Sequence, residues 1–88
     1  MGMKKVFPKA TRSCKVTDIK CHPEKMHRLL ISYELAGVSV FSMNKDRPLY
    51  TLSLSQEKDY HKGRVLSIAW FNDSEFVIGY QNGGLEVY

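Results

Sequence analysis

The stretch VLSIAWFNDSEFVIGYQNGGLEVY, residues 65–88, decides the fold of this chain. Short runs rich in Val, Ile, Tyr and Trp alternate in it with polar turn residues, which is typical of β-strands joined by tight turns. Asn82-Gly83 tolerates the positive φ that two-residue hairpin turns need, so this dipeptide indicates a hairpin. We therefore expect an antiparallel meander with strands at Val65–Trp70, Phe76–Tyr80 and Leu85–Tyr88.

A second copy of this pattern lies earlier in the chain. VTDI at 16–19 corresponds to VLSI at 65–68, 49 positions later, and GVSVF at 37–41 corresponds to GLEVY at 84–88, 47 positions later. The first copy therefore has two additional residues, which we place in its first turn, around 22–26. A self-match of ~40–50 residues is typical of β-propellers, in which each repeat forms one four-stranded blade.

The repeat divides the chain into parts. We expect a basic N-terminal arm at 1–15, a first blade at 16–54, a linker loop at 55–63 and a second, truncated blade at 64–88. The strands of the first blade are predicted at 16–21, 29–33, 38–43 and 49–54. The predicted fold class is all-β: an incomplete β-propeller with one complete antiparallel four-stranded blade and three strands of a second.

Composition and charge narrow the classes of function. A chain of 88 residues with 43% hydrophobic and 25% charged residues can form one small folded domain. It contains no run of the roughly 18 apolar residues that span a membrane, and no secretory signal, so a cytoplasmic location is expected. The net charge of +4 comes from the arm, which carries five cations and no acid: Lys4, Lys5, Lys9, Arg12 and Lys15.

Such an arm could contact an anionic membrane surface or nucleic acid through released counterions. We favour the simpler interpretation, a solvated tail, because the remaining residues carry eight cations against nine acids. A small basic nucleic-acid-binding β domain stays open as an alternative, and contact with a membrane surface is expected to be peripheral.

The sequence carries no signature of catalysis or of metal binding. Neither a GxSxG nucleophile motif nor a phosphate-binding loop occurs, so we expect a non-catalytic protein without a cofactor. Cys14 and Cys21 lack the spacing of a zinc half-site. We expect Cys21 to be a small core residue, and His22 and His27 to lie at the surface or in turns, without a metal.

The residues at several repeat positions resemble those of WD-repeat propeller blades. That family has a His four residues before its innermost strand, as His61 stands before Val65. It has an Asp in the hairpin before its third strand, where Asn82 stands here, and a Trp at the end of that strand, where Tyr88 and Phe41 stand. The resemblance implies a hydrogen-bond network between turns in which Asn82 accepts. The first copy has Arg12 and Leu35 at the His and Asp positions, so its network is lost.

A closer resemblance runs through VTDIKCHPEKMHRLLISYE at 16–34, GVSVFSMNKD and VLSIAW. These segments look like the lethal giant larvae and tomosyn family of twin-propeller proteins. The resemblance implies a protein-interaction scaffold that binds syntaxin-type SNAREs and regulates vesicle exocytosis and cell polarity. It covers roughly residues 16–88 and carries over no SNARE-contacting residue. A generic cytosolic WD-repeat scaffold fragment is the alternative within the same class.

Two blades leave apolar faces open, because each blade buries its faces on its neighbours. We therefore expect these residues to be part of a larger propeller, or to complete one by self-association. Trp70 ends an innermost strand and is expected to pack between adjacent blades. The alternative is that it anchors a binding partner, since Trp is enriched at binding hot spots. Val16 and Ile19 are expected to play the same structural role as their repeat partners Val65 and Ile68.

Overall fold

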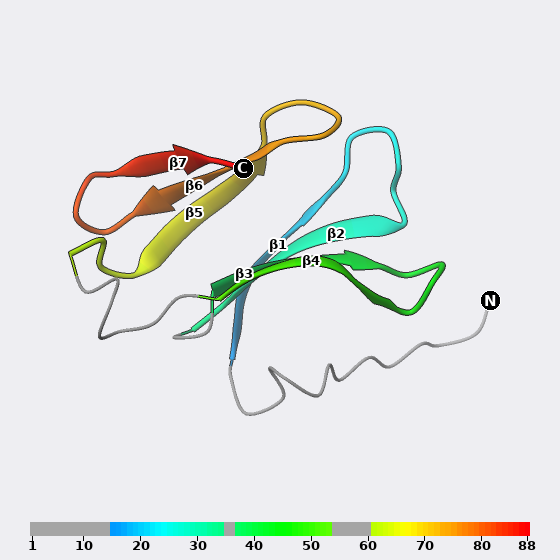
Figure 1. Cartoon of the computed structure of the whole chain (residues 1–88), viewed down its shortest axis with the longest axis horizontal. Coiled ribbons are helices and arrows are strands. Elements are labelled where there is room, and N and C mark those ends of the chain that lie inside the picture. Colours follow the sequence, from blue (N-terminus) through cyan, green and yellow to red (C-terminus); the bar gives the residue numbers. More distant parts are fainter. Residues whose placement is uncertain (1–14, 35–36, 54–60) are drawn as a thin grey trace.

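The computed structural model describes residues 15–34, 37–53 and 61–88, which form two antiparallel sheets and no helix (Figure 1). The four strands of the first sheet are β1 (Val16–Cys21), β2 (Arg28–Tyr33), β3 (Gly37–Ser42) and β4 (Arg47–Ser53). The three strands of the second sheet are β5 (Val65–Trp70), β6 (Phe76–Tyr80) and β7 (Leu85–Val87). The all-β fold with one four-stranded and one three-stranded sheet is thus confirmed.

Each sheet is a meander in which strands adjacent in sequence are adjacent in space. The turns use residues suited to left-handed backbone: Gly83 has φ of 90°, and Asp46, whose residue type tolerates this region, has φ of 57°. The bounds predicted for β1, β5 and β6 agree with the structure, and those of the remaining strands differ at their ends. The arm, apart from Lys15, and residues 54–60 lie outside the described residues.

The internal repeat extends to the pairing register of the two sheets. In the first sheet Val16 pairs with Tyr33 and Asp18 with Ser32, which leaves a bulge at Thr17. At the equivalent place in the second sheet Val65 pairs with Tyr80 and Ser67 with Gly79, and the register shifts in the same way. A bulge adds local twist and redirects the strand, so the two first strands are bent at corresponding points.

The core lies between the two sheets. Leu30, Val38 and Val40 of the first sheet form one cluster with residues of the second, while Ile31, Tyr33 and Phe41 form a separate cluster. Because side chains alternate between the two faces of a strand, these sets define opposite faces of the first sheet. We call the face with Leu30, Val38 and Val40 the front face, and the other the back face.

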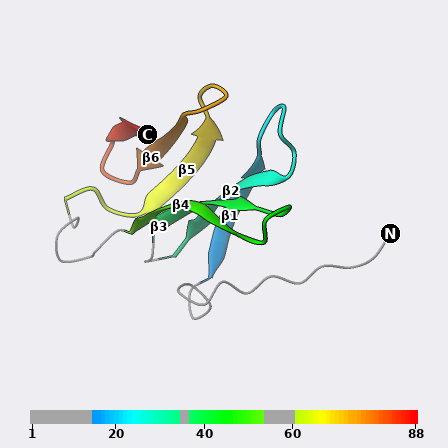
Figure 2. The same ribbon diagram turned by 45° about the vertical axis from the view of Figure 1, so that its right-hand side comes forward.

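The second sheet buries its back face, and not its front face, in the shared core. Its buried residues are Ile68, Phe76, Ile78 and Tyr80, and by the repeat Ile78 and Tyr80 correspond to Ile31 and Tyr33 on the back of the first sheet. The sheets therefore pack front to back. They approach each other where β5 lies against β1 and β2, and Figures 1 and 2 show β4 and β7 on the outer sides of this contact.

Candidate functional site

His22 joins the two sheets. Of the two places expected for it, the surface or a turn, His22 occupies the turn that follows β1, and it is not at the surface, because it is only 1% exposed. Nδ1 accepts the backbone N–H groups of Glu24 at 3.1 Å and Lys25 at 2.9 Å, and Nε2 lies 2.7 Å from the carbonyl oxygen of Asp73 in the second sheet. These partners fix the tautomer: Nδ1 is an acceptor and Nε2 carries the proton that it donates to Asp73. Both ring nitrogens are therefore engaged by backbone groups.

Trp70 forms the second half of this junction. Its indole packs edge-on against His22 with ring centroids 4.6 Å apart, and its Nε1 donates to the carbonyl of Lys20 at 3.2 Å. The end of β5 is thereby tied to the end of β1. Trp70 packs between the two sheets, as the sequence predicted for this residue. Its repeat equivalent, Cys21, is exposed, because it stands on the edge strand β1, on the face away from the second sheet. The prediction of a core cysteine is therefore wrong.

The turn before β5 is pinned to the β6–β7 hairpin. The side-chain amide of Asn82 donates to the carbonyl of His61 at 2.7 Å, and its backbone N–H donates to the carbonyl of Lys62 at 3.2 Å. The expected acceptor role of Asn82 is thus replaced by a donor role, which an Asp could not supply. Gly63 has φ of 74° and lies close to Gln81 of the hairpin. A Cβ added at Gly63 would stand 2.9 Å from the Cβ of Gln81.

Glu86 lies beside Lys62, Tyr80 and Tyr88. The Lys62 ammonium is 3.0 Å from its carboxylate and 5.5 Å from the centre of the Tyr80 ring. Interaction with the Tyr80 hydroxyl, and then with Lys62, holds the pKa of Glu86 below its ordinary value. Burial, and then the nearby carboxylate, raise the pKa of Tyr80 and of Tyr88. The cluster therefore favours an ionised Glu86 and neutral tyrosines.

This arrangement predicts a loss of stability in acid. Because the pKa of Glu86 is lower in the folded chain, its contribution is complete above the ordinary value of 4.5 and disappears as the pH falls through the folded pKa. In Glu86→Gln this contribution is absent, so the fall of the melting temperature between neutral pH and about pH 3 should be smaller than in the natural chain. Lys62→Gln should reduce the fall only in part, since Tyr80 is the larger cause. An unchanged acid profile in Glu86→Gln would contradict this interpretation.

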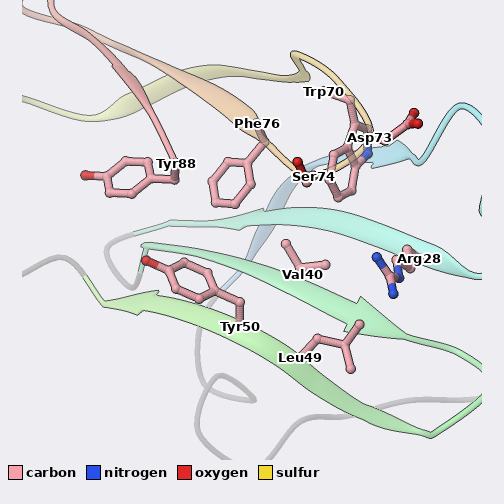
Figure 3. Close-up of a pocket in the computed structure, with 9 residues that line it drawn as sticks. All are labelled: Arg28, Val40, Leu49, Tyr50, Trp70, Asp73, Ser74, Phe76 and Tyr88. Carbon is pink, nitrogen blue, oxygen red and sulfur yellow. The ribbon is translucent and has the colours of Figure 1, made fainter.

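A pocket of about 570 Å³ lies between the sheets on the side of β4 and β7 (Figure 3). The first sheet contributes Arg28, Val40, Leu49 and Tyr50. The second sheet contributes Trp70 and Phe76, the turn between β5 and β6 contributes Asp73 and Ser74, and Tyr88 follows β7. Phe76 stacks on Tyr88 with centroids 5.7 Å apart, and Tyr50 meets its edge at 6.1 Å. Four of the nine lining residues are therefore aromatic.

The remaining residues singled out in the sequence do not meet at one place. Val65 packs against the shared core, whereas its equivalent Val16 and also Ile19 are about half exposed. Phe41 is buried on the back of the first sheet, and Tyr88 lines the pocket. Lys15 is exposed, and Lys4, Lys5, Lys9, Arg12 and Leu35 lie outside the described residues. Within 15–34, 37–53 and 61–88, no His, Cys, Asp and Glu side chains gather as a metal site would require.

Sequence reasoning missed the residues on which the pocket depends. Arg28 and Tyr50 read as an ordinary turn cation and an alternating strand residue. Phe76 and Tyr88 entered the sequence analysis only as residues of predicted strands, with Tyr88 at the position where WD repeats carry Trp.

Comparisons with known proteins find no match to the chain among family models, curated proteins or solved structures. In the part of the chain that the structure describes, no helix has the length and apolarity to span a membrane.

Proposed function

We propose that this chain is a non-catalytic protein-interaction scaffold built from two divergent WD-like blades of a β-propeller. The observation that carries the proposal is the shared register of the two meanders, with the same bulge after Val16 and after Val65. Sheets that repeat this closely are expected to pack on one another in one recurring way, as propeller blades do.

The front-to-back contact supports this architecture. A contact between unlike faces of similar units can be repeated, whereas a contact between like faces is complete after two. By the repeat, Val77, Leu85 and Val87 form the front face of the second sheet, and Leu85 and Val87 are 75% and 50% exposed. This face has the same chemistry as the buried front of the first sheet and could accept a further unit.

The resemblance to the lethal giant larvae and tomosyn family gives the scaffold its proposed partners, syntaxin-type SNAREs, in the cytoplasm and at the periphery of membranes. Loops and rims of the blades would present the binding surface, which is how propellers commonly recognise proteins. A generic cytosolic scaffold of the same fold is the alternative.

Calorimetric titration tests this function directly. The 88-residue chain is titrated with the soluble domain of a syntaxin-type SNARE, and with a sequence-scrambled version as the control. We expect saturable binding of the first and none of the second. If neither the SNARE domain nor its scrambled version binds, the SNARE assignment is contradicted. Binding of a single-stranded oligonucleotide that falls steeply between roughly 50 and 200 mM salt would instead favour the nucleic-acid alternative.

A further inference from the structure

The pocket between the sheets has one charged end. Arg28 lies at the opposite end from Tyr88 in Figure 3 and begins β2, from where its side chain reaches the pocket. Among the residues that the structure describes, this side chain makes no ion pair or hydrogen bond, and its Nε is fully buried without a partner. Arg28 as a whole is partly exposed, but a buried N–H group such as Nε costs free energy when it has no acceptor, so this end of the pocket favours a ligand that brings one, above all an anion.

The one acid of the lining does not neutralise Arg28. Asp73 uses its carbonyl oxygen to accept the bond from His22, and its carboxylate points away from Arg28 in Figure 3. The Ser74 hydroxyl is turned toward Asn72 and donates a hydrogen bond to its Oδ1 at 3.3 Å. Among the polar residues of the lining, Arg28 is therefore the one that can pair with a charged group of a ligand.

The rest of the wall selects an apolar, flat group. Tyr50, Trp70, Phe76 and Tyr88 offer ring faces and edges of the kind that aromatic side chains pack against. Val40 and Leu49 complete the apolar surface. An occupant that uses all of this lining carries an acceptor for Arg28 at one end, for which a carboxylate is suited, and an aromatic or branched apolar group close to it.

We propose that this pocket binds the C-terminal end of a polypeptide whose last residue is aromatic or branched and apolar, with its carboxylate on Arg28. Arg presents parallel N–H donors that match the two oxygens of a carboxylate. The volume of about 570 Å³ exceeds one side chain and falls in the range of pockets that take ligands of two or three residues. Tyr50 and Leu49 are 46% and 38% exposed, so the pocket is open where the chain of the peptide would leave.

Trp70 is the only tryptophan of the chain and lines the pocket, so its fluorescence reports occupancy. The probe is the tripeptide N-acetyl-Ala-Leu-Phe with a free carboxylate, and its control is the same peptide as the C-terminal amide. We expect a saturable fluorescence change with the acid and roughly tenfold weaker binding of the amide, because the amide loses a charge-assisted hydrogen bond.

Variants test the contribution of the Arg28 charge to binding separately from that of the apolar pocket walls. Arg28→Gln should weaken binding of the acid peptide by about tenfold and leave binding of the amide peptide unchanged. Arg64→Gln, at an exposed cation outside the pocket, should change the affinity for neither peptide. Circular dichroism establishes that each variant is folded. Should Arg28→Gln not fold, Tyr50→Ala at a half-exposed position takes its place, and it should weaken both peptides several-fold.

Three outcomes overturn the proposal. Equal affinity for the acid and the amide, or no effect of either on Trp70, removes the role of Arg28 as a carboxylate site. Binding of free 3-phenylpropanoate as tightly as the tripeptide assigns the pocket to a small aromatic acid instead of a peptide. The binding requires only the two packed sheets, so these results are independent of the SNARE titration.

Discussion

Replacing Ile78 by alanine should lower the free energy of unfolding by about 2–5 kcal/mol, the range for removing a large aliphatic side chain from a well-packed core. Ile78 is fully buried on β6, in the cluster that both sheets share. Its loss removes apolar contact with the front of the first sheet and leaves a cavity that the surrounding strands can fill only in part. Urea unfolding followed by circular dichroism measures the change.

Leu85→Ala is the matched control, because Leu85 belongs to the same sheet and is 75% exposed. Truncation there should change stability by no more than about 0.5 kcal/mol. If Leu85→Ala destabilised the monomeric chain as much as Ile78→Ala, the front face of the second sheet would be covered within the chain itself and the front-to-back arrangement would be wrong. The unfolding is therefore measured at a concentration at which the chain is a monomer.

His22→Ala should cost about 3 kcal/mol, because one buried ring serves three purposes. The variant loses the bond from Nε2 to Asp73, the edge contact with Trp70, and the acceptor for the backbone N–H groups of Glu24 and Lys25. Circular dichroism is the proper signal, since removing the ring next to Trp70 also changes the fluorescence of the folded chain.

His22→Asn separates the part of this cost that comes from the turn from the part that comes from the contact between the sheets. The asparagine oxygen can accept the same backbone N–H groups as Nδ1 does, which should restore about 1 kcal/mol. It reaches neither Asp73 nor Trp70, so the contribution between the sheets stays lost. His27→Asn, in the same hairpin but half-buried, should be close to neutral. Full recovery in His22→Asn would mean that His22 stabilises its own turn and does not join the sheets.

Much of the fold follows from local sequence patterns. Alternating and continuous apolar runs fix the strands, Asn82-Gly83 fixes a hairpin, and the self-match fixes the order of strands in both sheets. The alternation in β4 places Tyr50 and Leu52 on one face, and Leu52 packs against the shared core as Tyr50 meets Phe76. These features depend on residues close in sequence.

The errors concern contacts between the sheets. His22 stands next to a proline at the end of a strand, which indicates a turn, and its burial depends on Asp73, 51 residues later. Cys21 and Ile19 look like core residues until the face that meets the second sheet is known. The pocket is missed for the same reason, because alternation separates the two faces of a strand without saying which of them packs.

Aromatic contacts in solution test the front-to-back packing most directly. Nuclear Overhauser effects on the 88-residue chain should join the ring of Tyr50 to that of Phe76, whose centroids are 6.1 Å apart, and the ring of His22 to that of Trp70 at 4.6 Å. The nitrogen shifts of His22 should show the proton on Nε2. Contacts of Phe76 with Tyr33 or Phe41, on the back of the first sheet, would contradict the arrangement.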